Sequence, residues 1–345
     1  MAMKDFGWSA PRTLSEAAVA ASGTVADAMA TADAAAGSEL SFIKAGGIDL
    51  LDLLKENLLA PQTLVSLKDI PGLNTVEEQT GGGLRIGSMT SLANLAAHPV
   101  IRERYPALFD AVRSSATPQI RNVATLGGNL LQRPRCWYFR AAAFHCSRKG
   151  GDHCFAIPGE NQYHAIFGNE YCAIVHPSTA ATVLVALGAT VELVNAVGVG
   201  RRMLLEEFFV RPDQDIQREN DLKPHEILTA IHLPRLRASV RMAHLKQGEK
   251  DSFDWPLADV AVVLDFDANG ICNRAVMVLG AAAPVPHRAK DAEAVLVGKR
   301  IDATLSAQAA AAALKGATPL SKNAYKLPLF AALVRRAILK AAAGA

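Results

Sequence analysis

Two glycine pairs, Gly46-Gly47 and Gly127-Gly128, constrain most strongly what this 345-residue chain can fold into. The first pair lies in FIKAGGIDLLDLLK, where an apolar run enters the turn and leucines at helical spacing follow it. Adjacent glycines let backbone N–H groups approach an anion closely, and the following helix points its positive N-terminal end at the same place. The stretch therefore indicates a strand–turn–helix unit that can bind phosphate, with a plain turn as the alternative.

The second pair lies in RNVATLGGNLLQR, flanked by Thr125 and Asn129. Residues 118–130 are expected to form turns, and small polar side chains beside exposed N–H groups suit a pyrophosphate or a ribitol chain. Neither glycine pair belongs to a GxGxxG or a Walker motif. Together the two loops predict a nucleotide cofactor that is held by backbone amides from two separate segments.

The remaining pattern predicts an α+β protein of two domains. Short strands are expected at 40–44, 63–67 and 84–88, and a helix at 91–101. Residues 212–225 have the polar, proline-bounded composition of a linker, so we place an N-terminal domain at 1–218 and a C-terminal domain at 219–345. The C-terminal part predicts about three strands, including a hairpin at DANG, followed by alanine-rich helices. The alanine-rich segment 25–39 is expected to be an inserted loop or short helix without chemistry.

Composition excludes several classes of protein. Half of the residues are hydrophobic, so the chain is expected to be globular, and the formal net charge of +3 gives no case for nucleic-acid binding, which needs a clustered basic face. Its apolar runs are too short to span a membrane. The N-terminus lacks the pattern of a signal peptide, which predicts a cytoplasmic location by default. A protein exported to the periplasm while bound to a partner escapes this argument.

Four of the five cysteines lie in one window, residues 135–172, at spacing C-x9-C-x7-C-x17-C. A reducing compartment argues against disulfides, and the absence of a CxxC pair argues against the usual structural zinc pattern. Buried free thiols and a site made of four thiolates both remain open. The window also contains the histidines His145, His153 and His164, with His176 just beyond it, so a His/Cys zinc site is a further alternative. Cys272 lies on a predicted strand and is expected to be an inert core thiol.

The two loops resemble those of the flavin-binding subunits of the molybdenum hydroxylases, the xanthine dehydrogenase and aldehyde oxidoreductase group. The similarity rests on Ala45-Gly46-Gly47, on Arg121-Asn122 with Thr125 and Gly127-Gly128-Asn129, and on the intervening LRIGSMTSLANLAAHP. It implies a vanillyl-alcohol-oxidase-type FAD-binding domain of two α/β lobes, plus a C-terminal three-stranded sheet with helices. FAD is then expected between the lobes, with its pyrophosphate on the two glycine turns.

The resemblance also implies which residues contact FAD. These are Phe42, Ile43, Lys44, Ala45, Gly46, Gly47, Ile48, Asp49, Leu50, Thr125, Gly128, Asn129, Thr179 and Lys246. For Lys246 a solvated lysine at a strand end is the alternative. Thr179 is a departure from the family, which usually has an aspartate at this position. Threonine can donate or accept a hydrogen bond there but carries no charge.

The cysteine window is similar to an insertion in a subgroup of this family, the flavin subunits of certain bacterial aldehyde oxidoreductases and of 4-hydroxybenzoyl-CoA reductase. That subgroup holds an additional [4Fe–4S] cluster. The resemblance implies that Cys136, Cys146, Cys154 and Cys172 ligate such a cluster, and that the four histidines are surface groups or neighbours of the ligands.

What the resemblance implies about function is an oxidoreductase subunit that transfers electrons through FAD to an external acceptor. It implies two partners, a large subunit with a molybdenum cofactor and a small subunit with [2Fe–2S] clusters. Two other functions remain open: a stand-alone flavin oxidase of the same fold, and a non-catalytic assembly subunit stabilised by zinc.

Overall fold

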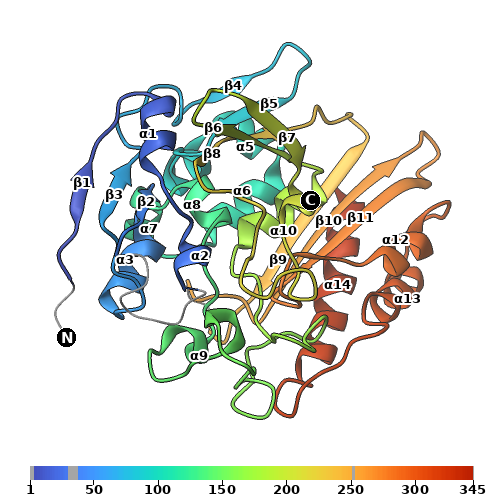
Figure 1. Ribbon diagram of the computed structural model, residues 1–345. Coiled ribbons are helices and arrows are strands. Elements are labelled where there is room, and N and C mark those ends of the chain that lie inside the picture. The colour runs from blue at the N-terminus through green and yellow to red at the C-terminus, as the bar shows by residue number, and fades with distance from the viewer. Residues whose placement is uncertain (1–3, 30–37, 251–252, 345) are drawn as a thin grey trace.

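The computed structural model describes residues 4–29, 38–250 and 253–344, which form three β-sheets with their helices (Figure 1). The first sheet is parallel, with strand order β1-β3-β2. Its elements are β1 (Gly7–Ser9), α1 (Leu14–Ala20), α2 (Val25–Met29), β2 (Ser41–Lys44), α3 (Ile48–Lys55) and β3 (Thr63–Ser66). Helix α3 connects two parallel strands and buries Leu50, Leu53 and Leu54. The strand and helix predicted on either side of Gly46-Gly47 are confirmed. Of the segment 25–39, residues 30–37 lie outside the described residues.

The second sheet is antiparallel, with strand order β4-β5-β8-β6-β7. Its elements are β4 (Val76–Glu78), β5 (Leu84–Gly87), α4 (Leu92–Ala97), α5 (Pro99–Arg104), α6 (Pro106–Arg113), α7 (Pro118–Val123), α8 (Leu126–Leu130), α10 (Thr179–Ala186), β6 (Thr190–Asn195), β7 (Gly200–Leu204), α11 (Leu205–Phe208) and β8 (Glu226–Leu233). The turns predicted over 118–130 are wrong, because this segment forms the short helices α7 and α8. Thr117 and Thr125 cap them, each accepting a hydrogen bond from a backbone N–H three residues later.

The third sheet has strand order β12-β11-β10-β9 and lies between two layers of helices. Its elements are β9 (Val240–Gln247), β10 (Ala258–Phe266), β11 (Cys272–Gly280), β12 (His287–Arg288), α12 (Lys290–Leu296), α13 (Ala303–Ala313) and α14 (Lys326–Ala343). Alternate residues of β10 face opposite layers: Ala261 and Val263 pack in the core that contains α10, and Val260 and Val262 pack in the core that contains α14. In Figure 1, α14 lies against this sheet.

The change from the second sheet to the third falls between Leu233 and Val240. Strand β8 follows the predicted division at 218/219, yet it pairs with β5 and β6 of the second sheet. The division into domains 1–218 and 219–345 therefore stays a prediction. Strand β8 lies in the predicted C-terminal domain, but it is hydrogen-bonded to two strands of the predicted N-terminal domain.

The cysteine window is part of a long connection from α8 to α10, which contains the short helix α9 (Trp137–Arg140) and a single 3-10 turn (Ser147–Lys149). Its backbone groups are satisfied by buried polar side chains, as an irregular segment in the interior requires. The Asn161 side chain, fully buried, donates to the carbonyls of Ala156, Ile157 and Gly159. The Asn323 side chain donates to the carbonyls at 164 and 165. The window is thereby fixed to the segment that precedes α14.

Lys326, the first residue of α14, is fully buried and donates to three carbonyls, those of Tyr163, His164 and Ala281, at 2.8–3.2 Å. Burial lowers the pKa of Lys326 to about 7. We expect Lys326→Met to lower the free energy of unfolding by about 2–4 kcal/mol, because it removes the donor from the carbonyls of Tyr163 and Ala281 and leaves that of His164 with Asn323 alone. Urea unfolding measures this.

The matched control is Lys315→Met, at an exposed lysine whose ion pair with Asp291 is 3.5 Å long. Its expected effect is within about 0.5 kcal/mol. Equal effects of the two substitutions would show that Lys326 does not fix the window to α14.

Candidate functional site

A cavity of about 740 Å³ opens where the three sheets meet. This volume is within the range of small-molecule sites, about 300–1,000 Å³. All but one of the predicted flavin-contact residues line it: Phe42, Ile43, Ala45, Gly46, Gly47, Ile48, Asp49, Leu50, Thr125, Gly128, Asn129, Thr179 and Lys246. The exception is Lys44, whose ammonium lies 5.5 Å from the centre of the Trp8 ring and donates to the Ala45 carbonyl. We refer to this space as the flavin cavity.

The first glycine turn is shaped by close backbone contact. A Cβ on Gly46 would lie 2.1 Å from the Val123 carbonyl oxygen, so only glycine allows the α3 turn to touch the end of α7. Gly47 has φ +86°, in the left-handed region that favours glycine. Helix α3 begins directly after it with no side chain capping its first N–H groups. Those groups and the helix dipole are available to an anion in the cavity.

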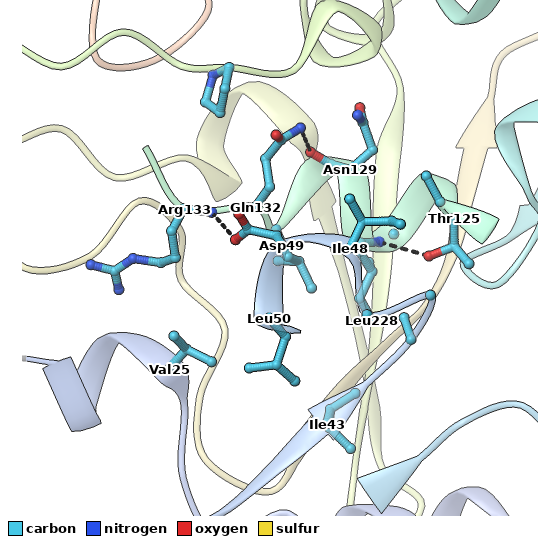
Figure 2. Close-up of a pocket in the computed structure, with 18 of the residues that line it drawn as sticks. Val25, Ile43, Ile48, Asp49, Leu50, Thr125, Asn129, Gln132, Arg133 and Leu228 are labelled. Carbon is cyan, nitrogen blue, oxygen red and sulfur yellow. Dashed lines mark hydrogen bonds between the residues drawn. The ribbon is translucent and has the colours of Figure 1, made fainter. Parts of the chain in front are cut away.

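Asp49, in the first turn of α3, is already neutralised by neighbours. Its carboxylate accepts a hydrogen bond from the backbone N–H of Arg133 at 2.8 Å (Figure 2). It also forms ion pairs with Arg135 at 2.8 Å and with Arg140 at 2.5 Å. The negative charge of Asp49 is therefore directed toward the start of the cysteine window, and the helix end remains attractive to a phosphate group.

The second glycine turn lies opposite the first. The Thr125 hydroxyl accepts a hydrogen bond from the Gly128 N–H at 3.1 Å (Figure 2). A Cβ on Gly127 would lie within 3 Å of Ser88, so this turn too needs a glycine at its point of closest packing. The side-chain oxygen of Asn129 accepts a hydrogen bond from the Ser178 hydroxyl at 2.5 Å. Asn129 thus fixes the start of α10 beside the last turn of α8.

Thr179 is the first residue of α10, after the capping residue Ser178, and is 5% exposed. Helices α3, α8 and α10 all begin at the wall of the cavity, so three partly positive helix ends meet there. Of these, α3 and α10 are eight residues long and α8 is five. With a threonine at this position, the start of α10 keeps that positive character, whereas an aspartate would neutralise it.

Lys246, near the end of β9, points its ammonium to the Ser114 carbonyl at 2.9 Å, and burial lowers the pKa of Lys246. It is therefore a half-buried group of the cavity wall rather than a fully solvated lysine. Other wall residues were not predicted from the sequence, among them Gln132, Arg133 and Leu228, all labelled in Figure 2. Leu228 reaches the cavity through the pairing of β8 with β5 and β6, a long-range contact with no local sequence signal.

The four window cysteines lie near one another, and their thiols influence one another electrostatically. Hydrogen bonding from Cys154, together with the charge of Arg148, lowers the pKa of Cys172 to about 5 against the effect of burial. Burial raises the pKa of Cys136 to about 12 and also raises the pKa of Cys146, with contributions from Cys172 in both cases. The same hydrogen bond is the largest cause that raises the pKa of Cys154, ahead of burial.

The part of the chain that the structure describes contains no group of three or more His, Cys, Asp or Glu side chains placed to hold a single metal ion. Four cysteine sulfurs around one zinc ion lie closer together than four around a four-iron cluster, because the cluster's iron atoms lie between the cysteine sulfurs. Cys272, as expected, is a buried thiol on β11, away from the window.

Three buried charged side chains connect the window with the flavin cavity. Arg148, 1% exposed, donates to Glu219 Oε1 at 2.6 Å and lies 3.5 Å from the Cys172 sulfur. Glu219 Oε2 lies 3.1 Å from Nε of Arg133, which lines the cavity. Burial acts to lower the pKa of Arg148, but Cys172 and Glu219 outweigh it and raise the pKa. Two buried cations with one carboxylate leave an excess of positive charge beside Cys172.

The histidines occupy different places. His145 and His153 are exposed, and His153 pairs with Asp152. Nε2 of His164 lies 3.2 Å from the Cys136 sulfur, so His164 adjoins one of the candidate ligands. His176 is buried against Phe209, with a ring-centre distance of 4.5 Å.

His176 predicts a pH dependence of stability. Its Nδ1 accepts a hydrogen bond from the Ser178 N–H at 3.3 Å, which requires the neutral ring, and burial lowers the pKa of His176 to about 3. In the unfolded chain the pKa is about 6.5. Below pH 6.5 the unfolded chain therefore binds one proton more than the folded chain, and stability falls as the pH falls toward 3, by up to about 1.4 kcal/mol per pH unit.

The measurement is urea unfolding between pH 7 and pH 4 for the wild type and for His176→Asn, whose side-chain oxygen can replace Nδ1 as the acceptor. We expect the variant to lose less stability than the wild type over this range. Parallel curves would contradict a neutral, buried His176.

Two known protein families match consecutive parts of the chain. Residues 4–236 match the family described as the FAD binding domain in molybdopterin dehydrogenase. Residues 243–341 match the CO dehydrogenase flavoprotein C-terminal domain. The two matches meet between β8 and β9, where the sheets change.

Relatives match over most of their length. The aldehyde oxidoreductase FAD-binding subunit PaoB of Escherichia coli is 34% identical over 288 residues, which cover 83% of this chain and 86% of that protein. The nicotinate dehydrogenase FAD-subunit of Eubacterium barkeri is 28% identical over 298 residues, covering 86% and 81%. Among solved structures, quinoline 2-oxidoreductase from Pseudomonas putida superposes with a TM-score of 0.74 at 26% identity, covering 100% of this chain and 99% of that chain.

Proposed function

The chain belongs to the family of FAD-binding subunits of the molybdenum hydroxylases, and from this premise we propose that it is the electron-transfer subunit of such an enzyme. In this proposal it binds FAD in the flavin cavity and a [4Fe–4S] cluster on its four window cysteines. The observation that carries the proposal is the meeting of two glycine turns and three helix starts at one cavity, because this arrangement suits a dinucleotide with a charged pyrophosphate.

The residues of the cavity fit FAD. The uncapped backbone N–H groups at the start of α3 are available to the pyrophosphate, and Thr179 and Asn129 offer hydrogen bonds without adding negative charge. The apolar wall formed by Phe42, Ile43 and Leu228 suits a flat ring system. When bound, FAD and the cluster supply the redox chemistry, and the chain supplies their placement and electrostatic surroundings.

The cysteine site fits a cluster that carries negative charge. Four thiolates around iron and sulfide form an anionic group, and the buried excess charge of Arg148 and Arg133 lies beside Cys172. Nη2 of Arg148 has no hydrogen-bond partner among the described residues. The ligands in this proposal are Cys136, Cys146, Cys154 and Cys172, with His164 as a neighbour of Cys136.

The proposed partners are a large subunit with a molybdenum cofactor, which would hydroxylate an aldehyde or a heterocycle, and a small subunit with [2Fe–2S] clusters. The relative from Escherichia coli is named as a subunit of an aldehyde oxidoreductase. No helix among the described residues is long and apolar enough to cross a membrane. Both the cytoplasm and, for a complex exported with a partner, the periplasm are compatible with the proposal.

The experiment that tests this function compares the chain alone with the chain purified together with its two partner subunits. A panel of aromatic aldehydes and nitrogen heterocycles is added anaerobically, and the flavin absorbance is followed. We expect bleaching of the flavin only when the partners are present. Turnover by the isolated chain would support a stand-alone flavin oxidase, and a colourless, zinc-containing chain would support an assembly subunit.

A further inference from the structure

Two buried polar connections run from the cysteine window to the wall of the flavin cavity. The first is the sequence of contacts from Cys172 to Arg148, from Arg148 to Glu219, and from Glu219 to Arg133. All three charged side chains are at most 4% exposed. Glu219 and Arg133 both line the cavity, whereas Arg148 does not.

The second connection joins the start of the window to the α3 turn. Asp49, which follows the glycine pair, accepts from the Arg133 N–H and pairs with Arg140, and these two residues bracket Cys136 in the sequence. Arg140 also donates to the carbonyls of Arg133 and Pro134. The position of Cys136 is therefore linked to the same helix start that forms the first glycine turn.

Buried charges are costly to desolvate, and an interior pair is not in general more stable than apolar residues of similar volume. A group of buried charges instead holds its members in one specific geometry, because removing one member leaves the others buried and unpaired. In this chain Arg148 is the member that touches the cysteine site, and Glu219 is the member that touches both Arg148 and the cavity wall. Both side chains are buried, so neither turns into solvent.

We propose that Arg148 is a positioning residue that couples the cysteine site to the flavin cavity, so that filling the cysteine site strengthens FAD binding. The inference rests on the proposed function, since it takes a [4Fe–4S] cluster as the occupant of the cysteine site. Filled thiolates hold Arg148 by charge, Arg148 holds Glu219, and Glu219 with Arg133 fixes part of the wall against which FAD binds. Coupling between two sites is reciprocal, so FAD also stabilises the cluster.

The test uses Arg148→Gln in the chain purified anaerobically with its partners, with Arg336→Gln as the matched control at an exposed arginine of α14. Iron and sulfide are assayed first, and the dissociation constant of FAD is then measured by fluorescence. We expect the Arg148 variant to bind FAD about tenfold more weakly, within the usual range of coupling between sites. The control should bind FAD as the wild type does.

The reduction potential of the cluster, measured by electron paramagnetic resonance, distinguishes the proposed positioning role of Arg148 from a merely structural one. Removing a cation beside a ligand thiolate disfavours the added electron, so the potential should become more negative in Arg148→Gln and stay unchanged in the control. If the variant fails to fold, the wild-type chain depleted of iron by a chelator replaces it, and its FAD affinity should fall by a similar factor.

The outcomes separate this inference from the proposed function. Wild-type FAD affinity and an unchanged potential in an iron-loaded Arg148→Gln protein would overturn the coupling and leave the cluster in place. Unchanged FAD affinity after removal of iron from the wild type would do the same. A wild-type chain that contains FAD and no iron would overturn both the coupling and the cluster.

Discussion

Replacing Gly46 by alanine is expected to remove most FAD binding. The new Cβ would lie 2.1 Å from the Val123 carbonyl oxygen, and a backbone oxygen cannot rotate away as a side chain can. The α3 turn would have to separate from the end of α7, which moves the two glycine turns apart. Strain of this kind costs about 1–3 kcal/mol, and its upper end corresponds to roughly 100-fold weaker binding.

The matched control is Gly81→Ala. Gly81 lies in the turn between β4 and β5, and a Cβ there would meet no atom within 4 Å. Both variants are titrated with FAD by fluorescence, and their thermal unfolding is recorded to confirm that they fold. If Gly46→Ala binds FAD as tightly as the control, the close contact of the two turns is not what shapes the site.

Replacing Cys172 by serine is expected to remove most of the iron. Cys172 is the buried thiol whose pKa is lowered to about 5, and it interacts with Arg148 and with the thiols of Cys136, Cys146 and Cys154. A hydroxyl is a poor ligand for iron in such a site, because the cluster is held by thiolates. We expect the content to fall from about four iron and four sulfide per chain to a small residue.

Cys272→Ala is the control, since that thiol is buried on β11 away from the window. It should keep the full iron content. Both variants are purified anaerobically and assayed for iron, sulfide and zinc. Iron that survives in Cys172→Ser but is lost in Cys272→Ala would assign the metal to another site.

Local features of this chain could be predicted from sequence, and long-range ones could not. The turn at Gly46-Gly47 followed by a helix is readable because strand, glycine and leucine spacing lie within a few residues of one another. The helices α7 and α8 were missed, although Thr117 before Pro118 is a recognisable start of a helix. Their short length makes the helical period hard to detect.

The candidate site shows the same limit. The glycine turns were identified from sequence, but Leu228 enters the cavity wall only because β8 pairs inside the second sheet. Arg148 and Glu219 are 71 positions apart, and nothing in their neighbourhoods marks them as partners. The spacing of the cysteines left both free thiols and a four-thiolate site open, with free thiols the commoner case, and only the fold places their sulfurs near enough to shift one another's pKa.

The most direct test of the account is the absorption spectrum of the anaerobically purified chain, with flavin, iron, sulfide and zinc measured on the same sample. The account predicts bound FAD together with about four iron and four sulfide per chain. FAD without iron would contradict the cluster and leave a plain flavin subunit. Zinc without flavin would contradict the electron-transfer function itself.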